Sequence, residues 1–155
     1  MSDEKPKAVV YLDLNNLFHR YKKLDFIKLR KELAKKYDLV RVSAYTAINL
    51  QDENQRKFII YLSNNNYKVT TIDLTENTDM DSIIICDIIN DSCSKLDYSD
   101  IVFIGSDGDF GYPLSLLSRK GYKINIIGCK DNTSLELLKC ADISETLESY
   151  GVILQ

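Results

Sequence analysis

The sequence predicts an α/β fold, in which helices cover both faces of a central, mostly parallel sheet within a single three-layer domain. Short apolar segments of strand length alternate along the chain with longer segments whose apolar residues recur at helical spacing. Such alternation is typical of βαβ units, whose right-handed connections place helices on both sides of the sheet. The clearest strand is the run IVFI at 101–104, because continuous apolar residues indicate a strand buried on both faces.

Local signals predict the order of the elements. Asp52 followed by Gln55 is a capping-box pattern, Pro113 suits a first helical turn, and Gly121 suits a helix end. The strands are expected at 8–12, 39–47, 67–74, 101–104 and 122–127. The helices are expected at 17–21, 26–37 and 53–64, from Thr78 or Asp79 to Ser92, from Phe110 to 120, and after a cap at Thr133 or Ser134. The pattern from Ile143 onward favours neither state. Doubly wound sheets commonly start at the centre and wind outward in both directions, which predicts strand order 3-2-1-4-5.

Length and composition indicate one domain. With 155 residues, of which 45% are hydrophobic, the chain can build one core, and we expect a flexible segment at 1–7, the domain at 8–150 and a tail at 151–155. No apolar run has the length of a membrane span or a signal core, so we predict a cytoplasmic protein without membrane contact. The four cysteines form no C-x-x-C pair and the chain has one histidine, so buried thiols are expected rather than zinc or disulfide sites.

Several aspartates follow predicted strands. Asp107 and Asp109 come directly after the strand at 101–104, Asp13 ends the first strand, and Asp81 lies in the first turn of the helix that precedes 101–104. In the predicted order the first and fourth strands are neighbours, so these carboxylates converge where ligands bind in open α/β sheets. Local explanations also exist. One aspartate after the strand can cap a helix, and the helix dipole favours an acid in a first turn.

A cluster of carboxylates has a chemical consequence. Like charges repel, and no strongly basic residue is adjacent in sequence to any of the four aspartates. A hard cation such as Mg²⁺ or Mn²⁺ is the counter-charge that suits oxygen ligands. Such an ion can position a phosphodiester, lower the pKa of a water molecule and stabilise the leaving oxygen, which predicts metal-assisted hydrolysis.

The motifs also carry a resemblance. They are Asp13 and Asn16 in DLNN, Asp81 and Asp87 six residues apart, GSDGDF at 105–110, Gly121, and Ser134 with Ala141 and Asp142. In this order and spacing the chain resembles the NYN domain, a branch of the PIN-like ribonucleases, over nearly its whole length. The resemblance implies a PIN-like fold and a metal-dependent ribonuclease, which we interpret as an endonuclease.

The resemblance also implies roles for individual residues. The acidic metal-binding and catalytic positions would be Asp13, Asp81, Asp107 and Asp109, and the supporting positions Asn16, Ser106 and Asp87. Asp87 lies about 120° round its helix from Asp81, which favours a structural or supporting acid. Two positions differ from many relatives: Thr78 replaces a lysine, and Gly105-Ser106 replaces Ser-Gly.

Other functions remain open at this level. A non-catalytic RNA-binding or regulatory module would keep the fold and the acids, because fold constrains function only loosely. A Toprim-like domain also uses a D-x-D pair with Mg²⁺ but expects a glutamate where this chain has Asp13. A haloacid-dehalogenase phosphatase would need an aspartate at Asn15.

The basic residues gather in one part of the chain. Eight lie between 20 and 36 against two acids, whereas 73–109 holds ten acids and one lysine. Lys28, Lys31 and Lys35 share one helical face and are expected to point to solvent, so they are the predicted phosphate contacts for single-stranded or structured RNA. The alternative is that this lysine face only keeps the protein soluble, and that RNA enters elsewhere, past Arg119, Lys120 and Lys123. The sequence leaves homo-oligomerisation undecided.

Overall fold

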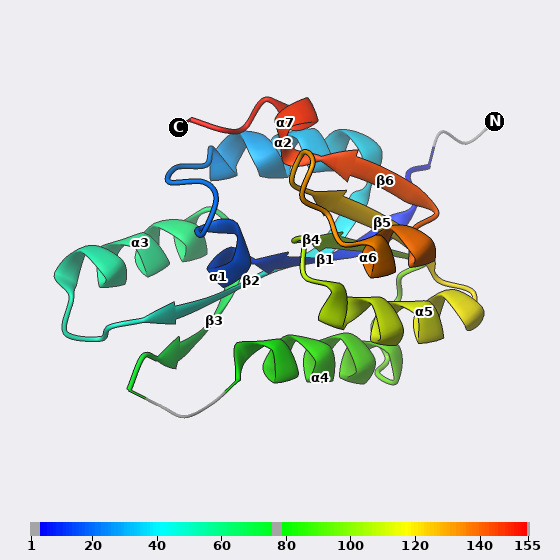
Figure 1. Ribbon diagram of the computed structural model, residues 1–155, viewed down its shortest axis with the longest axis horizontal. Coiled ribbons are helices and arrows are strands. Elements are labelled where there is room, and N and C mark those ends of the chain that lie inside the picture. Colours follow the sequence, from blue (N-terminus) through cyan, green and yellow to red (C-terminus); the bar gives the residue numbers. More distant parts are fainter. Residues whose placement is uncertain (1–3, 76–78, 155) are drawn as a thin grey trace.

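A six-stranded parallel sheet runs through the centre of the structure, a computed structural model that describes residues 4–75 and 79–154 (Figure 1). The strands are β1 (Lys7–Asp13), β2 (Asp38–Ile48), β3 (Lys68–Asp73), β4 (Asp100–Ile104), β5 (Lys123–Gly128) and β6 (Ile143–Thr146). Their order, β3-β2-β1-β4-β5-β6, confirms the predicted α/β fold and the predicted order of the first five strands. All neighbours pair in parallel, and β6, from the segment without a prediction, extends the sheet beside β5.

Helices cover both faces of the sheet. One face carries α1 (Leu14–Leu17), α2 (Phe26–Lys36), α3 (Glu53–Asn64) and α7 (Leu147–Tyr150), and the other carries α4 (Met80–Ser92), α5 (Gly111–Arg119) and α6 (Leu135–Cys140). The side chains of β1 alternate between two cores: Val10 and Leu12 pack under the first group, and Val9 and Tyr11 under the second. This double burial explains why the strands appear in the sequence as continuous apolar runs.

Side-chain caps set most helix starts near their predicted positions. Asp52 accepts backbone hydrogen bonds from Asn54 and Gln55 (2.9 and 3.3 Å), so the predicted cap at Asp52 is correct. The reciprocal half of the capping box is not formed, because the Gln55 side chain accepts the N–H of Asn49 (2.7 Å) instead. Asp79 caps α4, and the alternative start at Thr78 lies outside the described residues. The helix expected at 17–21 is wrong, because the chain coils immediately after β1 into the single turn of α1.

A short 3₁₀ turn, η1 (Gly108–Phe110), separates β4 from α5. Asp107 caps this turn, so the following α-helix begins at Gly111 rather than at Phe110. Gly121 ends the helix region as predicted, with φ at 105°, a conformation that side chains with a Cβ rarely adopt. The Asp107 cap and the 3₁₀ turn thus make the loop after β4 tight at the place where Asp107 and Asp109 lie.

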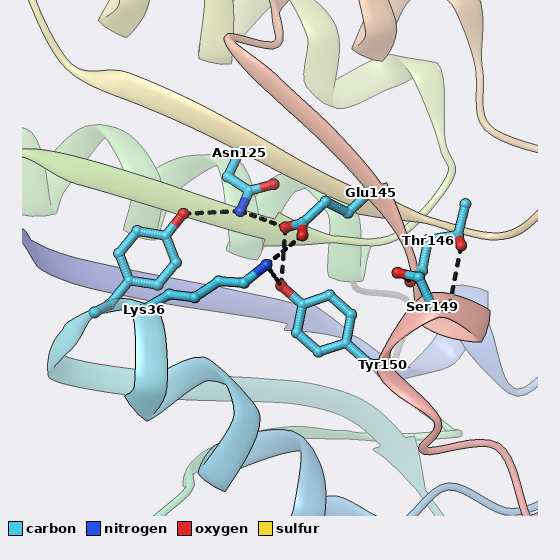
Figure 2. A network of polar contacts seen from close by, with 7 residues as sticks. Lys36, Asn125, Glu145, Thr146, Ser149 and Tyr150 are labelled. Carbon is cyan, nitrogen blue, oxygen red and sulfur yellow. Dashed lines mark hydrogen bonds and ion pairs between the residues drawn. The ribbon is translucent and has the colours of Figure 1, made fainter.

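A partly buried polar network fastens the β6 edge to α2 (Figure 2). The side-chain amide of Asn125 on β5 donates to the Tyr37 hydroxyl (2.8 Å) and to the Glu145 carboxylate (2.9 Å). Glu145 also accepts from Tyr150 (2.8 Å) and forms an ion pair with Lys36. Because the partners come from the end of α2, from β5, from β6 and from α7, the network fixes β6 and α7 against the rest of the domain.

Two further expectations concern cysteines and membranes. The four thiols are free, and burial is correct for Cys129. It is wrong for Cys86 and Cys93, which are exposed because α4 turns Ile84 and Ile88 toward the sheet instead. Within 4–75 and 79–154, no helix combines the length and the apolar character that crossing a membrane requires.

Candidate metal centre

Four aspartates meet at the carboxyl edge of the sheet, at the point where β1 and β4 lie side by side. The two strands pair up to Leu12 opposite Ile104, so Asp13 and the loop with Asp107 and Asp109 leave the sheet together. Asp81 enters from the first turn of α4, held by the Asp79 cap. The predicted convergence is therefore present in the structure.

Three of these carboxylates form one compact group. Oxygen atoms of Asp81, Asp107 and Asp109 all lie within 4.8 Å of one another. Asp13 lies outside this group of three but near it. The charge of Asp13 raises the pKa of Asp81, and the charge of Asp107 raises the pKa of Asp13. Asp13 is 2% exposed, whereas Asp109 lies at the surface. The cluster thus runs from a buried acid to an accessible one.

The electrostatics of the cluster are unfavourable to full ionisation. Burial raises the pKa of Asp13 to about 6, with a backbone hydrogen bond from Asn16 opposing the shift. Burial and the charges of Asp13 and Asp107 raise the pKa of Asp81 to about 7. Both shifts have the direction expected for carboxylates that are desolvated beside like charges.

Ion pairs do not compensate the cluster in the part of the chain that the structure describes, although the charge of His19 opposes the rise in the pKa of Asp13 as the smallest of its causes. Among the described residues, no lysine or arginine forms an ion pair with any of the four aspartates. Hard carboxylate oxygens at this spacing, with their charge unbalanced, are a donor set that fits a divalent cation such as Mg²⁺ or Mn²⁺. The residues present can therefore hold the metal that the sequence predicts.

Asn16 joins the ends of the two central strands. Its backbone N–H donates to Asp13 (3.2 Å), and its side-chain oxygen accepts from the backbone N–H of Ser106 (2.9 Å). Ser106 in turn accepts, through its hydroxyl, the N–H of Cys129 (3.2 Å). Two of the three predicted supporting residues, Asn16 and Ser106, therefore hold the loop after β4 to the segments that follow β1 and β5.

Asp107 serves a local role as well as a shared one. One of its oxygens accepts the backbone N–H of Asp109 (2.9 Å), which is the capping role that the sequence left open. Its carboxylate still belongs to the group of three. Capping and clustering are thus compatible, and the cap holds the carboxylate in a fixed direction.

Two features of the site were not predicted. A Cβ at Gly108 would lie 2.4 Å from the Ser134 hydroxyl, so a side chain here would have to displace the cap of α6 where that helix begins against the acidic loop. Asp79 adds a further negative charge that raises the pKa of Asp81. The helix-start pattern accounts only for its capping role, whereas its position two residues before Asp81 also indicates a place beside the cluster.

The remaining predicted residues lie apart from the cluster. Asp87, further along α4, accepts a hydrogen bond from the Tyr45 hydroxyl (2.8 Å), so its contacts are structural. On α2, Lys28 donates to the Gly151 carbonyl (3.1 Å) and Lys35 pairs with Glu32 (3.0 Å). Lys31 is exposed on the same helix.

The alternative basic surface lies at the amino-terminal ends of the strands, opposite the ends that carry the aspartates. Lys123 begins β5 and pairs in register with Asp100 at the start of β4. Arg119 and Lys120 end α5 just before it. Because the aspartates follow the opposite ends of the strands, an RNA bound at this basic group would reach the cluster only by spanning the full length of the strands.

Comparisons with known proteins agree with this architecture. A crystal structure of a protein of unknown function from Vibrio parahaemolyticus superposes with a TM-score of 0.82 at 22% identity, covering 99% of each chain. This likeness shows the fold. No curated protein sequence matches the chain. The sequence profile of the NYN domain matches residues 7–148, nearly the whole chain. This match favours the NYN domain over the Toprim-like domain and the haloacid-dehalogenase phosphatase. The chain therefore belongs to the NYN domain family, within the PIN-like nuclease superfamily.

Proposed function

We propose that the protein is a metal-dependent ribonuclease that hydrolyses RNA phosphodiester bonds at the acidic cluster. The observation that carries the proposal is the group of three carboxylates whose oxygens lie within 4.8 Å, with no cationic partner among the described residues. Membership of the NYN family supports nuclease chemistry. The cluster supports dependence on a divalent cation.

The residues divide the work by position. Asp81, Asp107 and Asp109 would hold Mg²⁺ or Mn²⁺, and Asp13, buried behind them, adds negative charge from the end of β1. When bound, the metal supplies an activated water and stabilises charge on the leaving oxygen. Asn16 and Ser106 keep the ends of β1 and β4 together, so the carboxylates stay in place while substrate binds.

Incubation with labelled RNA tests the activity. Purified protein should cleave single-stranded or hairpin RNA in Mn²⁺ or Mg²⁺, and a chelator should stop cleavage. Asp107→Asn, purified in the same way, separates the protein's own activity from a contaminating nuclease. Cleavage that survives both the chelator and the substitution would contradict the proposal.

A circular RNA substrate decides the mode of attack. An endonuclease linearises a circle, whereas an exonuclease leaves it intact because it needs a free end. We propose endonucleolytic cleavage because the cluster lies on an open edge, with Asp109 at the surface. RNA binding without turnover in any divalent metal would favour the non-catalytic alternative, an RNA-binding or regulatory module of the same fold.

A further inference from the structure

A groove of about 650 Å³ opens between α1, α3 and the ends of β2 and β3. We call it the aromatic groove and define it by six of its lining residues. They are Phe18, Lys22, Lys23, Asn54, Phe58 and Tyr61. It combines rings, positive charge and a side-chain amide on one open surface, and no role at the metal centre accounts for it.

The rings form a row with exposed members. The centroids of Phe18 and Phe58 lie 5.9 Å apart, and those of Phe58 and Tyr61 lie 6.5 Å apart with their planes at 21°. Phe18 is 38% exposed and Tyr61 is 39% exposed. Phe58 packs below on Phe26 (5.5 Å), which fixes the row to the core. Rings held at such a surface offer flat faces to another planar group.

Two lysines supply charge at the rim. Lys22 and Lys23 are exposed, and neither forms an ion pair with another described residue. The aspartates of the metal centre lie on segments other than those that carry these lysines, and they form no ion pair with them. Unpaired cations beside flat rings complement a chain that alternates phosphates with bases. Asn54 is exposed and can bond to the edge of a base.

Hydrogen bonds connect the segment that follows Asp13 with the lining of the groove. Asn15, two residues after Asp13, accepts the backbone N–H of Ala47 (2.8 Å) and lies 3.4 Å from the Thr46 hydroxyl. Both Thr46 and Ala47 line the groove. Phe18 follows α1 directly, so the chain that leaves β1 at Asp13 continues into the lining of the groove.

We propose that the aromatic groove binds unpaired nucleotides of single-stranded RNA that flank the bond cleaved at the acidic cluster. Bases stack on the row of rings, and phosphates contact Lys22 and Lys23. The proposal rests on the proposed function for the role of the cluster. A duplex cannot use the groove because its bases are already stacked on one another. The groove therefore selects single-stranded substrate.

Binding measured in chelator, where cleavage is stopped, tests the rings. A labelled 12-nucleotide single strand and a blunt duplex of the same sequence serve as probes. Replacing Phe18 and Tyr61 together by leucine keeps the apolar bulk and removes two rings. Single-strand affinity should fall about tenfold, within the range measured for base stacking, while duplex affinity stays unchanged. Thermal unfolding verifies that the variant is folded. Unchanged single-strand affinity in a folded variant overturns the proposal.

The lysines give an independent measurement. Replacing Lys22 and Lys23 by glutamine should reduce the slope of log affinity against log salt by about 1.4 for the single strand, because each phosphate contact contributes about 0.7. The matched control replaces Lys120 and Lys123, by the amino-terminal ends of the strands, by glutamine and should leave the slope unchanged. Equal slopes in the two variants overturn the proposal.

These measurements separate this inference from the proposed function. Weakened binding by the ring variant, with no cleavage in any metal, supports the groove and removes the nuclease. Metal-dependent cleavage together with unchanged binding by both groove variants keeps the nuclease and removes the groove. A change of sedimentation with the ring substitutions, at unchanged RNA affinity, would assign the groove to a second copy of the chain and overturn the proposal.

Discussion

Helix α4 carries two kinds of aspartate, and their surroundings differ. At its first turn, Asp81 lies among carboxylates, and its pKa is raised to about 7 by burial and by the charges of Asp13 and Asp107. Further along, the Asp91 side chain is 6% exposed, accepts a hydrogen bond from the Tyr11 hydroxyl (2.5 Å) and forms an ion pair with Arg41. The same residue type on one helix is thus compensated at one end and uncompensated at the other.

The difference shows which acids serve the fold. A buried charge costs free energy unless it is paired, and the Asp91 contacts provide that pairing from β1 and β2. Among residues 4–75 and 79–154 the acidic cluster finds no such ion pair, so its geometry must be held by the rest of the structure. Asn16 and Ser106 do this by joining strand ends rather than by neutralising charge. A site left with unbalanced charge is suited to bind a cation.

Substitution at each kind of aspartate gives the largest contrast. Asp107→Asn should lower metal-dependent cleavage by more than about 100-fold, since even indirect partners of metal ligands cost 10- to 100-fold. Removing one like charge should leave the metal-free fold intact or slightly more stable. Asp87→Asn, the matched control on α4, should keep cleavage because its partner is the Tyr45 hydroxyl. Initial rates and thermal unfolding measure both variants, and a fully active Asp107→Asn would remove this residue from the site.

The compensated acid should instead affect stability. Asp91→Ala leaves Arg41 and the Tyr11 hydroxyl without their partner, so the free energy of unfolding should fall by about 3 kcal/mol. Denaturant titration gives the value, and metal affinity of the folded variant should match that of the wild type. A loss of metal affinity without loss of stability would reverse the assignment of the two groups.

Metal and pH should act together on the uncompensated group. Saturating Mn²⁺, at about 100 times Kd, should stabilise the wild type by about 2.7 kcal/mol, and the Asp107→Asn variant much less. The shift in melting temperature should be larger at pH 8 than at pH 5.5, since Asp13 and Asp81 must lose protons with pKa values of about 6 and about 7.

The metal-free protein should show the opposite trend. Because folding raises both pKa values, these carboxyls contribute stability that is fully present below their unfolded pKa, near 4. It is lost as pH rises through about 6 and about 7. Asp81→Asn should remove part of this decline. Equal metal-induced shifts at pH 5.5 and pH 8 would argue against coordination by these two groups.

Sequence patterns predicted the parts of the structure that depend on local periodicity and caps. The apolar run before Asp107 and the run before Asp13 predicted neighbouring buried strands, and parallel topology then brought their carboxyl ends together. The pairing of Asp91 with Arg41 lacked such a signal, because it depends on contacts between residues 50 positions apart. The aromatic groove was missed for the same reason, since its rings come from separate elements.

The smallest expected effect concerns the basic face of α2. Charge reversal of Lys28, Lys31 and Lys35 to glutamate should weaken RNA binding about equally across sequences and flatten its salt dependence, while metal affinity stays constant. The contacts of Lys28 with Gly151 and of Lys35 with Glu32 already engage two of the three, so the loss should be smaller than for the groove lysines. Salt titrations of both variants compare the surfaces directly. An unchanged slope in the α2 variant would mean that this face only keeps the protein soluble, and that phosphates are held elsewhere along the edge that carries the acidic cluster.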